Sequence, residues 1–504
     1  MSSHAVTDFD EDLPAINLLN SVLCTGTSKR HSTPKPVAVP PASHIALLST
    51  LAIHPLYTTR AEKAELCNIA NLSLAYLQSL LDVAGPLSAD FSKAFQVNTL
   101  SRYTRAGGYG GTENNSDSSD VESDRDDDRL RGKMSHDSGV WNRSRDFWAL
   151  VGWAFRCSTL HPSRWQYWRR WLSFVLDLLE KDWEERLRLD LESHELSGEN
   201  GDAPAVSRQD SLIAKYLGNL SGEAGCRTLV RALLATGERN AAAYPEIFDR
   251  ESRGPKKSSN KRKRDAVLDL ENDCFGDYFD EESMSSGVSE PPTPQKPKDG
   301  RQQAPSDASS GLLESNELRL RLFKILATAM QTLREKDLGD LYWTLASEIK
   351  ILPLPMFSLL VTTRLNPLLE MSQQAVTKDL LRQLLQKRPR AMDENNVLDL
   401  EMAKKHFICQ AANTSATDDN AKLSLVVENT LQLLWRGMLS NSNENFDGLV
   451  EAAEKGIAAR EARPRKKRSA SHGGQKEEAL AQQVLTRSGN RIRILVETMV
   501  EFAE

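Results

Sequence analysis

Residues 163–187, SRWQYWRRWLSFVLDLLEKDWEERL, carry the clearest structural pattern in the chain. Large apolar side chains recur there every three or four positions, the spacing at which residues share one face of an α-helix. Ser163 follows His161-Pro162 and suits the N-cap position. So broad an apolar arc predicts a long helix that packs against more than one neighbour. The arc consists of Trp165, Trp168, Trp171, Leu172, Phe174, Val175, Leu178, Leu179, Trp183 and Leu187.

Tryptophan is concentrated around this helix. Seven of the nine tryptophans are Trp141, Trp148, Trp153, Trp165, Trp168, Trp171 and Trp183. Arginines lie between them, and an Arg beside an aromatic ring can stack on a base or form a contact centre for a partner. Helical spacing instead predicts that the indoles form the core. We expect core packing and keep a binding face as the alternative.

The same helical spacing recurs through most of the chain, and no stretch shows the sustained period-2 alternation of a strand. The predicted fold is all-α, an irregular stack of helical hairpins interrupted by long disordered insertions. In pattern alone it resembles HEAT or armadillo solenoids, although no fixed repeat is present, and a helical bundle is the alternative.

Shifts in composition predict where the folded parts begin and end. Polar, Pro-rich or charged tracts that cannot bury enough apolar area are interpreted as disordered. The predicted segments are a disordered N-terminal segment at 1–42, a helical part at 43–100, a disordered acidic Ser-rich insertion at 104–140, a Trp-rich helical unit at 141–248, a disordered linker with basic and acidic blocks at 250–312, a helical unit at 313–459, a basic linker at 460–478 and a C-terminal helix at 479–504. The linker at 250–312 is interpreted as either a domain boundary or a surface insertion.

Charge and cysteine usage exclude several classes of protein. The formal net charge is −6, so a global basic field for nucleic acid is absent. The six cysteines are far apart and form no C-x-x-C, which argues against a disulfide framework and a zinc site. The N-terminus lacks the features of a signal peptide, and no run of about 18 uncharged apolar residues predicts a membrane span. We expect an intracellular protein without a cofactor or a membrane partner.

Enzyme signatures are also missing from the sequence. There is no G-x-x-x-x-G-K-[ST], no G-x-S-x-G and no H-E-x-x-H. The sequence therefore predicts a protein without catalytic residues, although groups far apart in sequence can converge in a fold.

Two dense basic clusters predict nuclear import. Such clusters offer several cations to an acidic groove on an import carrier, which would be one partner. The alternative is a solvated run of charge. The second cluster could instead touch nucleic-acid phosphates, weakly and with strong salt dependence. The first comprises Lys256, Lys257, Lys261, Arg262, Lys263 and Arg264, and the second comprises Arg465, Lys466, Lys467 and Arg468.

An acidic-aromatic tract at 265–282 follows the first basic cluster. It mixes eight Asp and Glu with apolar side chains, which is typical of short partner-binding or activation segments. The alternative is an acidic block that offsets the basic one. The predicted partner-binding residues are Leu268, Leu270, Phe275, Tyr278 and Phe279.

Three residues are predicted phosphorylation sites. Thr293 precedes Pro294 and Lys296, a pattern that cyclin-dependent kinases accept, and Ser469 and Ser471 follow the second basic cluster, as basophilic kinases require. Phosphate at Ser469 would partly neutralise the cations beside it.

Together these patterns predict a non-enzymatic nuclear scaffold or adaptor subunit of a multiprotein assembly, linked to chromosome maintenance or cell-cycle control. Two alternatives are a transcription cofactor that acts through the tract 265–282 and a nucleic-acid-binding or ribosome-assembly factor that uses 463–468. The identity of the other subunits does not follow from the sequence.

Overall fold

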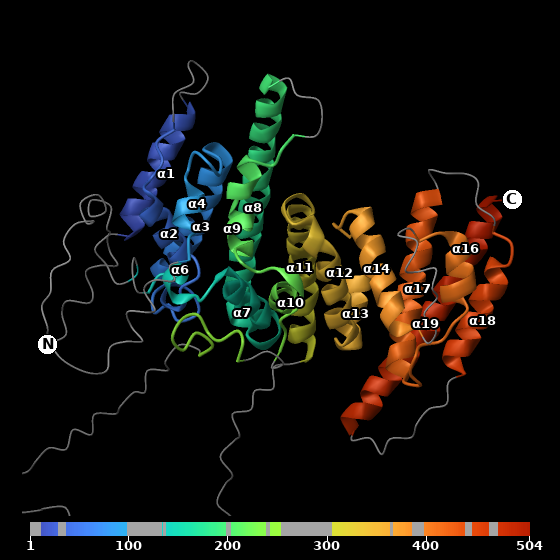
Figure 1. The fold of residues 1–504 in the computed structure, drawn as a ribbon. Helices are drawn as coiled ribbons and strands as arrows, with labels where there is room; N and C mark the ends of the chain where they lie inside the picture. The colour runs from blue at the N-terminus through green and yellow to red at the C-terminus, as the bar shows by residue number, and fades with distance from the viewer. Residues whose placement is uncertain are drawn as a thin grey trace, which may run out of the picture.

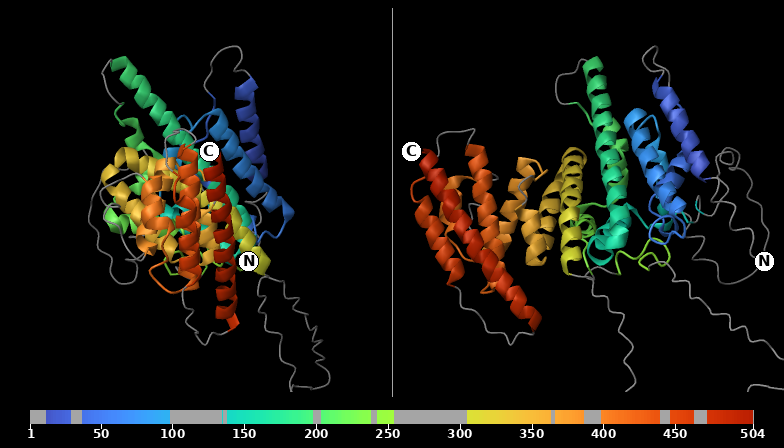
Figure 2. Two further views of the ribbon diagram at one scale, coloured as in Figure 1. Left: turned by 90° about the vertical axis from the view of Figure 1, so that its right-hand side faces the viewer. Right: turned by 180° about the vertical axis from the view of Figure 1, so that it is seen from behind.

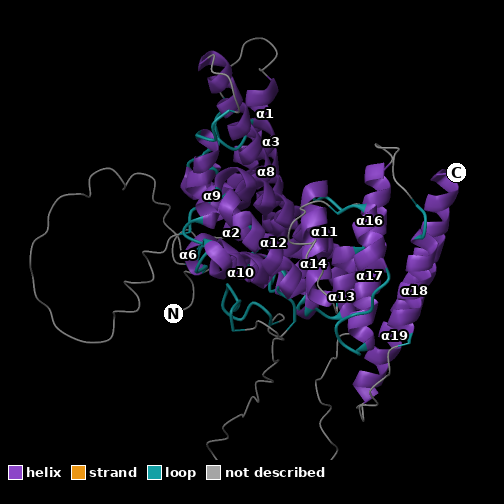
Figure 3. Ribbon diagram, turned by 45° about the vertical axis from the view of Figure 1, so that its right-hand side comes forward, coloured by secondary structure: helices purple, strands orange, loops and turns teal. Residues whose placement is uncertain are grey.

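The computed structural model describes residues 12–28, 37–97, 134, 138–197, 203–237, 242–253, 305–362, 366–385, 398–438, 446–462 and 472–503. Within these ranges the chain forms seventeen α-helices, and its only β-type pairing is one isolated bridge between Leu385 and Ala412. The helices follow one another along an elongated stack (Figures 1 and 3). The all-α helical stack predicted from the sequence is confirmed.

One layer of the stack is formed by parallel helices. It contains α3 (Ala64–Val83), α8 (Pro162–Ser197) and α11 (Pro305–Leu333). Arg170 and Lys181 of α8 contact Asn71 and Asp82 of α3 in the same order along both helices. Trp165 and Asp177 of α8 likewise contact Glu314 and Arg321 of α11. The three helices therefore run in one direction.

A second layer lies against the first. It contains α7 (Phe147–Leu160), α10 (Gly222–Leu233), α12 (Glu335–Lys350) and α14 (Glu370–Leu384). Arg334, just before α12, donates to the carbonyl of Leu220, just before α10, and Arg231 pairs with Glu348 near the other end. A turn at His161 joins α7 to α8 across the two layers. This is the arrangement of a helical-hairpin stack (Figure 2).

The C-terminal end of the stack contains a parallel pair, α17 (Thr417–Met438) and α19 (His472–Ala503), with α18 (Leu449–Glu461) beside them. Thr417 contacts Glu478, Ser424 contacts Ser488, and the Trp435 ring meets Phe502 edge-on. A π-helical turn, η3 (Lys404–Ile408), follows α16 (Leu400–Ala403) and packs on α18.

Shorter helices complete the stack. At its N-terminal end are α1 (Asp12–Ser28), α2 (Ala42–Leu51) and α4 (Phe91–Ala94), with the short 3₁₀-helix η1 (Pro55–Tyr57). Farther along the chain are α6 (Val140–Arg143), the 3₁₀-helix η2 (Ser207–Asp210), α9 (Leu212–Leu217) and α13 (Leu354–Val361).

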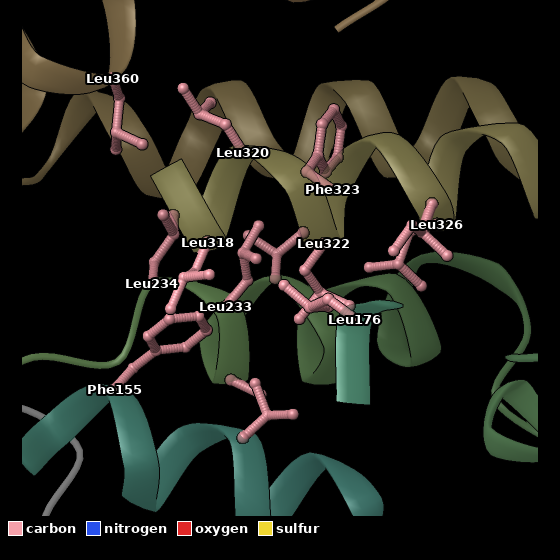
Figure 4. Close-up of a cluster of buried hydrophobic side chains, with 14 of the residues drawn as sticks. Phe155, Leu176, Leu233, Leu234, Leu318, Leu320, Leu322, Phe323, Leu326 and Leu360 are labelled. Atoms are coloured by element: carbon pink, nitrogen blue, oxygen red, sulfur yellow. The ribbon is translucent and has the colours of Figure 1, made fainter. Parts of the chain in front are cut away.

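Helix α11 is the centre of one continuous core. It contacts α7, α8, α9, α10, α12 and α13. Figure 4 shows its leucines facing Phe155 of α7, Leu176 of α8 and Leu233 of α10, while Leu360 of α13 lies on its other side. The connected buried residues run from Ile16 to Met499. The linker at 250–312 therefore interrupts a shared core and does not separate two cores.

The tryptophan cluster belongs to this core. All seven tryptophans of 141–192 are buried, and the indole rings of Trp168 and Trp171 pack edge to face. The Trp171 N–H donates to the buried Ser49 hydroxyl at 3.0 Å. Because the indoles are covered by neighbouring helices, they provide no exposed stacking platform, and core packing is the correct interpretation.

Three predicted segment boundaries differ from the structure. α1 lies inside the N-terminal segment predicted to be disordered, because Ile16 and Leu23 are buried against the core as α1 packs on α3. α11 begins at Pro305, inside the predicted linker 250–312. α19 begins at His472, inside the predicted linker 460–478. α11 and α19 begin before their apolar stripes, which is why spacing alone placed their starts inaccurately. α1 carries only two buried hydrophobic residues, too few to predict a packed helix from spacing.

Gly456 provides a test of the C-terminal packing. A Cβ at Gly456 of α18 would lie 1.8 Å from the Ile408 carbonyl oxygen at the end of η3, whereas a Cβ at Gly339 of α12 would meet nothing within 4 Å. Gly456→Ala should lower stability by about 1–3 kcal/mol through overpacking. Gly339→Ala should raise it by up to about 1 kcal/mol, because Ala favours a helix over Gly. The midpoint of thermal unfolding measures both, and equal shifts in the two variants would contradict the close approach.

Candidate binding pockets and the buried network beside them

None of the functional residues predicted from the sequence lies in a described range. The structure therefore does not test them and brings none of them together. They are the import residues Lys256, Lys257, Lys261, Arg262, Lys263, Arg264, Arg465, Lys466, Lys467 and Arg468, the phosphorylation residues Thr293, Ser469 and Ser471, and the partner-binding residues Leu268, Leu270, Phe275, Tyr278 and Phe279. The described residues instead reveal groups that sequence patterns did not identify.

Residues 242–253, which we call the strap, cross the Trp-rich helices just before the linker. Tyr244, Ile247 and Phe248 are buried. A Cβ at Gly152 of α7 would lie 2.3 Å from the Tyr244 ring, so only glycine permits the ring to lie this close to α7. The apolar residues of the strap could have indicated this packing, because three large side chains fall within five positions.

A fully buried ion pair fastens the strap to α8. Glu251 is 0% exposed and Arg164 is 1% exposed, and their charged atoms lie 2.6 Å apart. The Trp168 N–H also donates to Glu251 at 2.6 Å. Arg164 in turn donates to the Thr58 hydroxyl and the Ile53 carbonyl. Every charge in this network has a hydrogen-bonding partner, which a buried ion pair requires if it is not to destabilise the fold.

His54 lies beside the same network. Its ring meets Phe248 edge-on with centroids 4.7 Å apart, and its Nδ1 accepts from the Leu56 N–H. Burial, with a smaller contribution from the Arg164 charge, lowers the pKa of His54 to about 3. His54 is therefore neutral near pH 7, and a hydrogen-bond acceptor is the role that its position supports.

Cys157 and His161 lie one helical turn apart near this network, the spacing at which a thiol and an imidazole could form a catalytic pair. Burial raises the pKa of the Cys157 thiol well above its usual value, and burial lowers the pKa of His161. Among the described contacts, no hydrogen bond joins the two side chains. A thiol that is 0% exposed and protonated is not an activated nucleophile.

Two further buried arginines bind backbone carbonyls. Arg319 of α11 donates to the carbonyls of Leu233, Phe155 and Ala235, and its guanidinium lies 4.1 Å from the Phe155 ring centroid. Arg460 donates to the carbonyls of Ile408 and Gln410. Burial lowers the pKa of Arg319 to about 9 and that of Arg460 to about 10. Leu233 is the last residue of α10 and Ile408 the last of η3, and carbonyls at such ends, which lack a partner within the helix, attract a cation.

The first pocket lies where α8 and α11 begin and encloses about 450 Å³. Its cations already have partners. Arg169 pairs with Glu314 at 2.8 Å, and Arg170 donates to Asn71. Glu314 also accepts from the Trp165 N–H.

The second pocket encloses about 380 Å³ between α4, α7 and α9. Its floor is apolar, with Phe95, Phe147 and Leu212 buried. Lys215 and Arg145 lie at its rim. Nothing in the local sequence distinguished these residues, because they come together only through the packing of three helices.

No metal or membrane feature accompanies these pockets in the described part of the chain. Nowhere in it do three or more His, Cys, Asp or Glu side chains gather in a way that could hold a metal ion. None of its helices is long and apolar enough to cross a bilayer.

Comparison with known proteins adds no family. No protein-family model matches this chain, and no curated protein is significantly similar to it.

The buried pair predicts a large effect of a single substitution in the strap. Glu251→Ala would leave Arg164 buried without its carboxylate, at a cost of about 3–5 kcal/mol. We expect a lower thermal midpoint and faster tryptic cleavage after Arg250 and Arg253. Glu348→Ala is the control, because it breaks the more exposed pair with Arg231 and should cost about 1 kcal/mol or less. Similar losses in the two variants would show that burial of the pair does not matter.

Proposed function

We propose that this chain is a non-enzymatic nuclear scaffold or adaptor subunit of a multiprotein assembly. The observation that carries the proposal is the single core that joins all parts of the stack. A continuous core holds the surfaces of successive hairpins at fixed distances, which is the property a scaffold needs to position several partners.

The chemistry of the described pockets supports the non-enzymatic part of the proposal. The first pocket is lined by Arg, Glu, Gln and Ser side chains with one Trp and one Pro, and the second by Lys, Arg, Asp, Ser and Gln with aromatic and aliphatic side chains. Neither lining includes a His or a Cys. In both, the carboxylate is already held by an arginine, Glu314 by Arg169 and Asp146 by Arg145, so neither is placed as a free general base.

The described residues that flank the two basic clusters support access by an import carrier. The described residues on either side of 254–304 and of 463–471 lie along one edge of the stack, the lower edge in Figure 1. The described chain therefore ends beside each cluster at this same edge, opposite the edge where α8 projects.

Nuclear localisation is tested by removing both clusters. Replacing Lys261 to Arg264 and Arg465 to Arg468 with Ala should move a tagged protein to the cytoplasm, because the carrier loses its cationic contacts. Fluorescence microscopy measures the nuclear fraction of the tagged protein. Variants with only one of the two clusters replaced are the controls, and they show how much import each cluster supports alone. A double variant that stays nuclear would contradict a signal in these segments.

Deleting 265–282 distinguishes a scaffold from a cofactor that acts through this tract. We expect the deletion variant to retain most of the partners of the intact chain, because the folded stack supplies the docking surfaces. Quantitative mass spectrometry of the purified complexes, with an equal-length Gly-Ser replacement as the control, measures the retention. Loss of most partners from both variants would favour the cofactor.

A further inference from the structure

The second pocket combines an apolar floor with an aromatic wall. Phe95 and Phe147 are fully buried at its base. The Tyr216 ring stacks on Phe147 with centroids 4.0 Å apart and an angle of 7° between the planes. The Tyr216 hydroxyl donates to the Phe95 carbonyl, so this hydroxyl is already used and the ring presents apolar surface. A cavity of about 380 Å³ with this lining suits one aromatic side chain of a ligand.

The rim of the pocket carries excess positive charge. Within the described residues, the Lys215 ammonium contacts the Ser92 hydroxyl at 3.0 Å and no carboxylate. Arg145 contacts Asp146 at 2.7 Å, but Asp146 is also the N-cap of α7, where it accepts from the Ala149 N–H. The Asp146 carboxylate thus offsets both the Arg145 guanidinium and the partial positive charge at the N-terminus of α7, a 14-residue helix. The rim therefore favours an acidic ligand.

We propose that this pocket binds the acidic-aromatic tract of the same chain, residues 265–282. The tract supplies both features that the pocket requires. Phe275, Tyr278 and Phe279 are candidate side chains for the apolar floor, and Asp273, Asp277 and Asp280 lie beside them in sequence. This inference does not depend on the proposed nuclear function.

The strap brings the start of the tether close to the pocket. Asp249 pairs with Arg143 at 3.1 Å, and Arg143 lies two residues before Arg145 at the pocket rim. The strap ends at Arg253, whose N–H donates to the Arg250 carbonyl in a turn beside Asp249. Eleven residues, 254–264, separate it from the tract, and an extended chain of that length reaches about 35–40 Å. The tract can therefore reach the pocket without any change in the folded stack.

Tethering also strengthens a modest interaction. A short flexible tether gives an effective concentration of about 1 mM, so a pocket that binds the free peptide with a dissociation constant of about 10 µM would be about 99% occupied by the tethered tract. A competing free peptide would then appear about 100-fold weaker. Binding of the pocket by the tract of the same chain can therefore be measured as a loss of affinity for the free peptide.

The test uses a fluorescein-labelled peptide of residues 265–282 and two full-length chains. One is the natural chain, and the other carries an equal-length Gly-Ser segment in place of 265–282. Fluorescence anisotropy should show binding to the replaced chain and about 100-fold weaker binding to the natural chain. Equal binding to both would overturn occupancy by the chain's own tract, and absence of binding to the replaced chain would overturn the site.

Matched variants assign the binding to the pocket. In the replaced chain, Lys215→Glu and Arg145→Glu should each weaken peptide binding at least tenfold, whereas Lys336→Glu, at an exposed position at the start of α12, should not. A peptide with Ser in place of Phe275, Tyr278 and Phe279 keeps every charge and should also bind at least tenfold more weakly. Full binding of that peptide would show attraction by charge alone, and full binding by the Lys215→Glu chain would place the contact elsewhere.

Discussion

Burial of α8 on more than one side is the constraint on which the rest of the stack depends. Its tryptophans and leucines cover so wide an arc that no single neighbouring helix could remove them from water. α3 and α11 pack parallel to it, and α7 folds back beside it. Once α11 is placed in this way, its own apolar residues require α10, α12 and α13 on the remaining sides. Hydrophobic burial thus propagates along the stack from the Trp-rich helices.

Apolar packing alone does not determine the register of one helix against the next, because leucine contacts tolerate small shifts. Polar contacts at the edges of the layers determine this register. Lys181 with Asp82, Arg321 with Glu180, and Arg231 with Glu348 each join neighbouring helices at one defined level. Ion pairs that remain partly open to solvent add little stability, so the main contribution of these three is to favour one alignment over its neighbours.

Charges buried in the core have a different role. Arg164 with Glu251, Arg319 and Arg460 each bind groups that would otherwise be buried without partners, namely a carboxylate or helix-end carbonyls. They join segments that are far apart in sequence, such as the strap and α8. Since an unpaired buried charge is far more costly than a paired one, the contacts of Arg319 with the Leu233 and Ala235 carbonyls hold α11 against the part of the chain before the linker.

Much of the fold could be predicted from the sequence because helix formation is a local property. Apolar spacing identified α8, the burial of its tryptophans and the lack of strands in the part of the chain that the structure describes, all of which depend on residues within a few turns of one another. The strap and the second pocket could not be predicted in this way. Nothing in the sequence around Glu251 indicates its ion pair, because Arg164 is far away in the chain. Lys215 and Arg145 line one pocket only because α7 and α9 pack together. Periodicity within one segment determines which side of a helix is buried, whereas contacts between distant segments determine which charges and cavities meet.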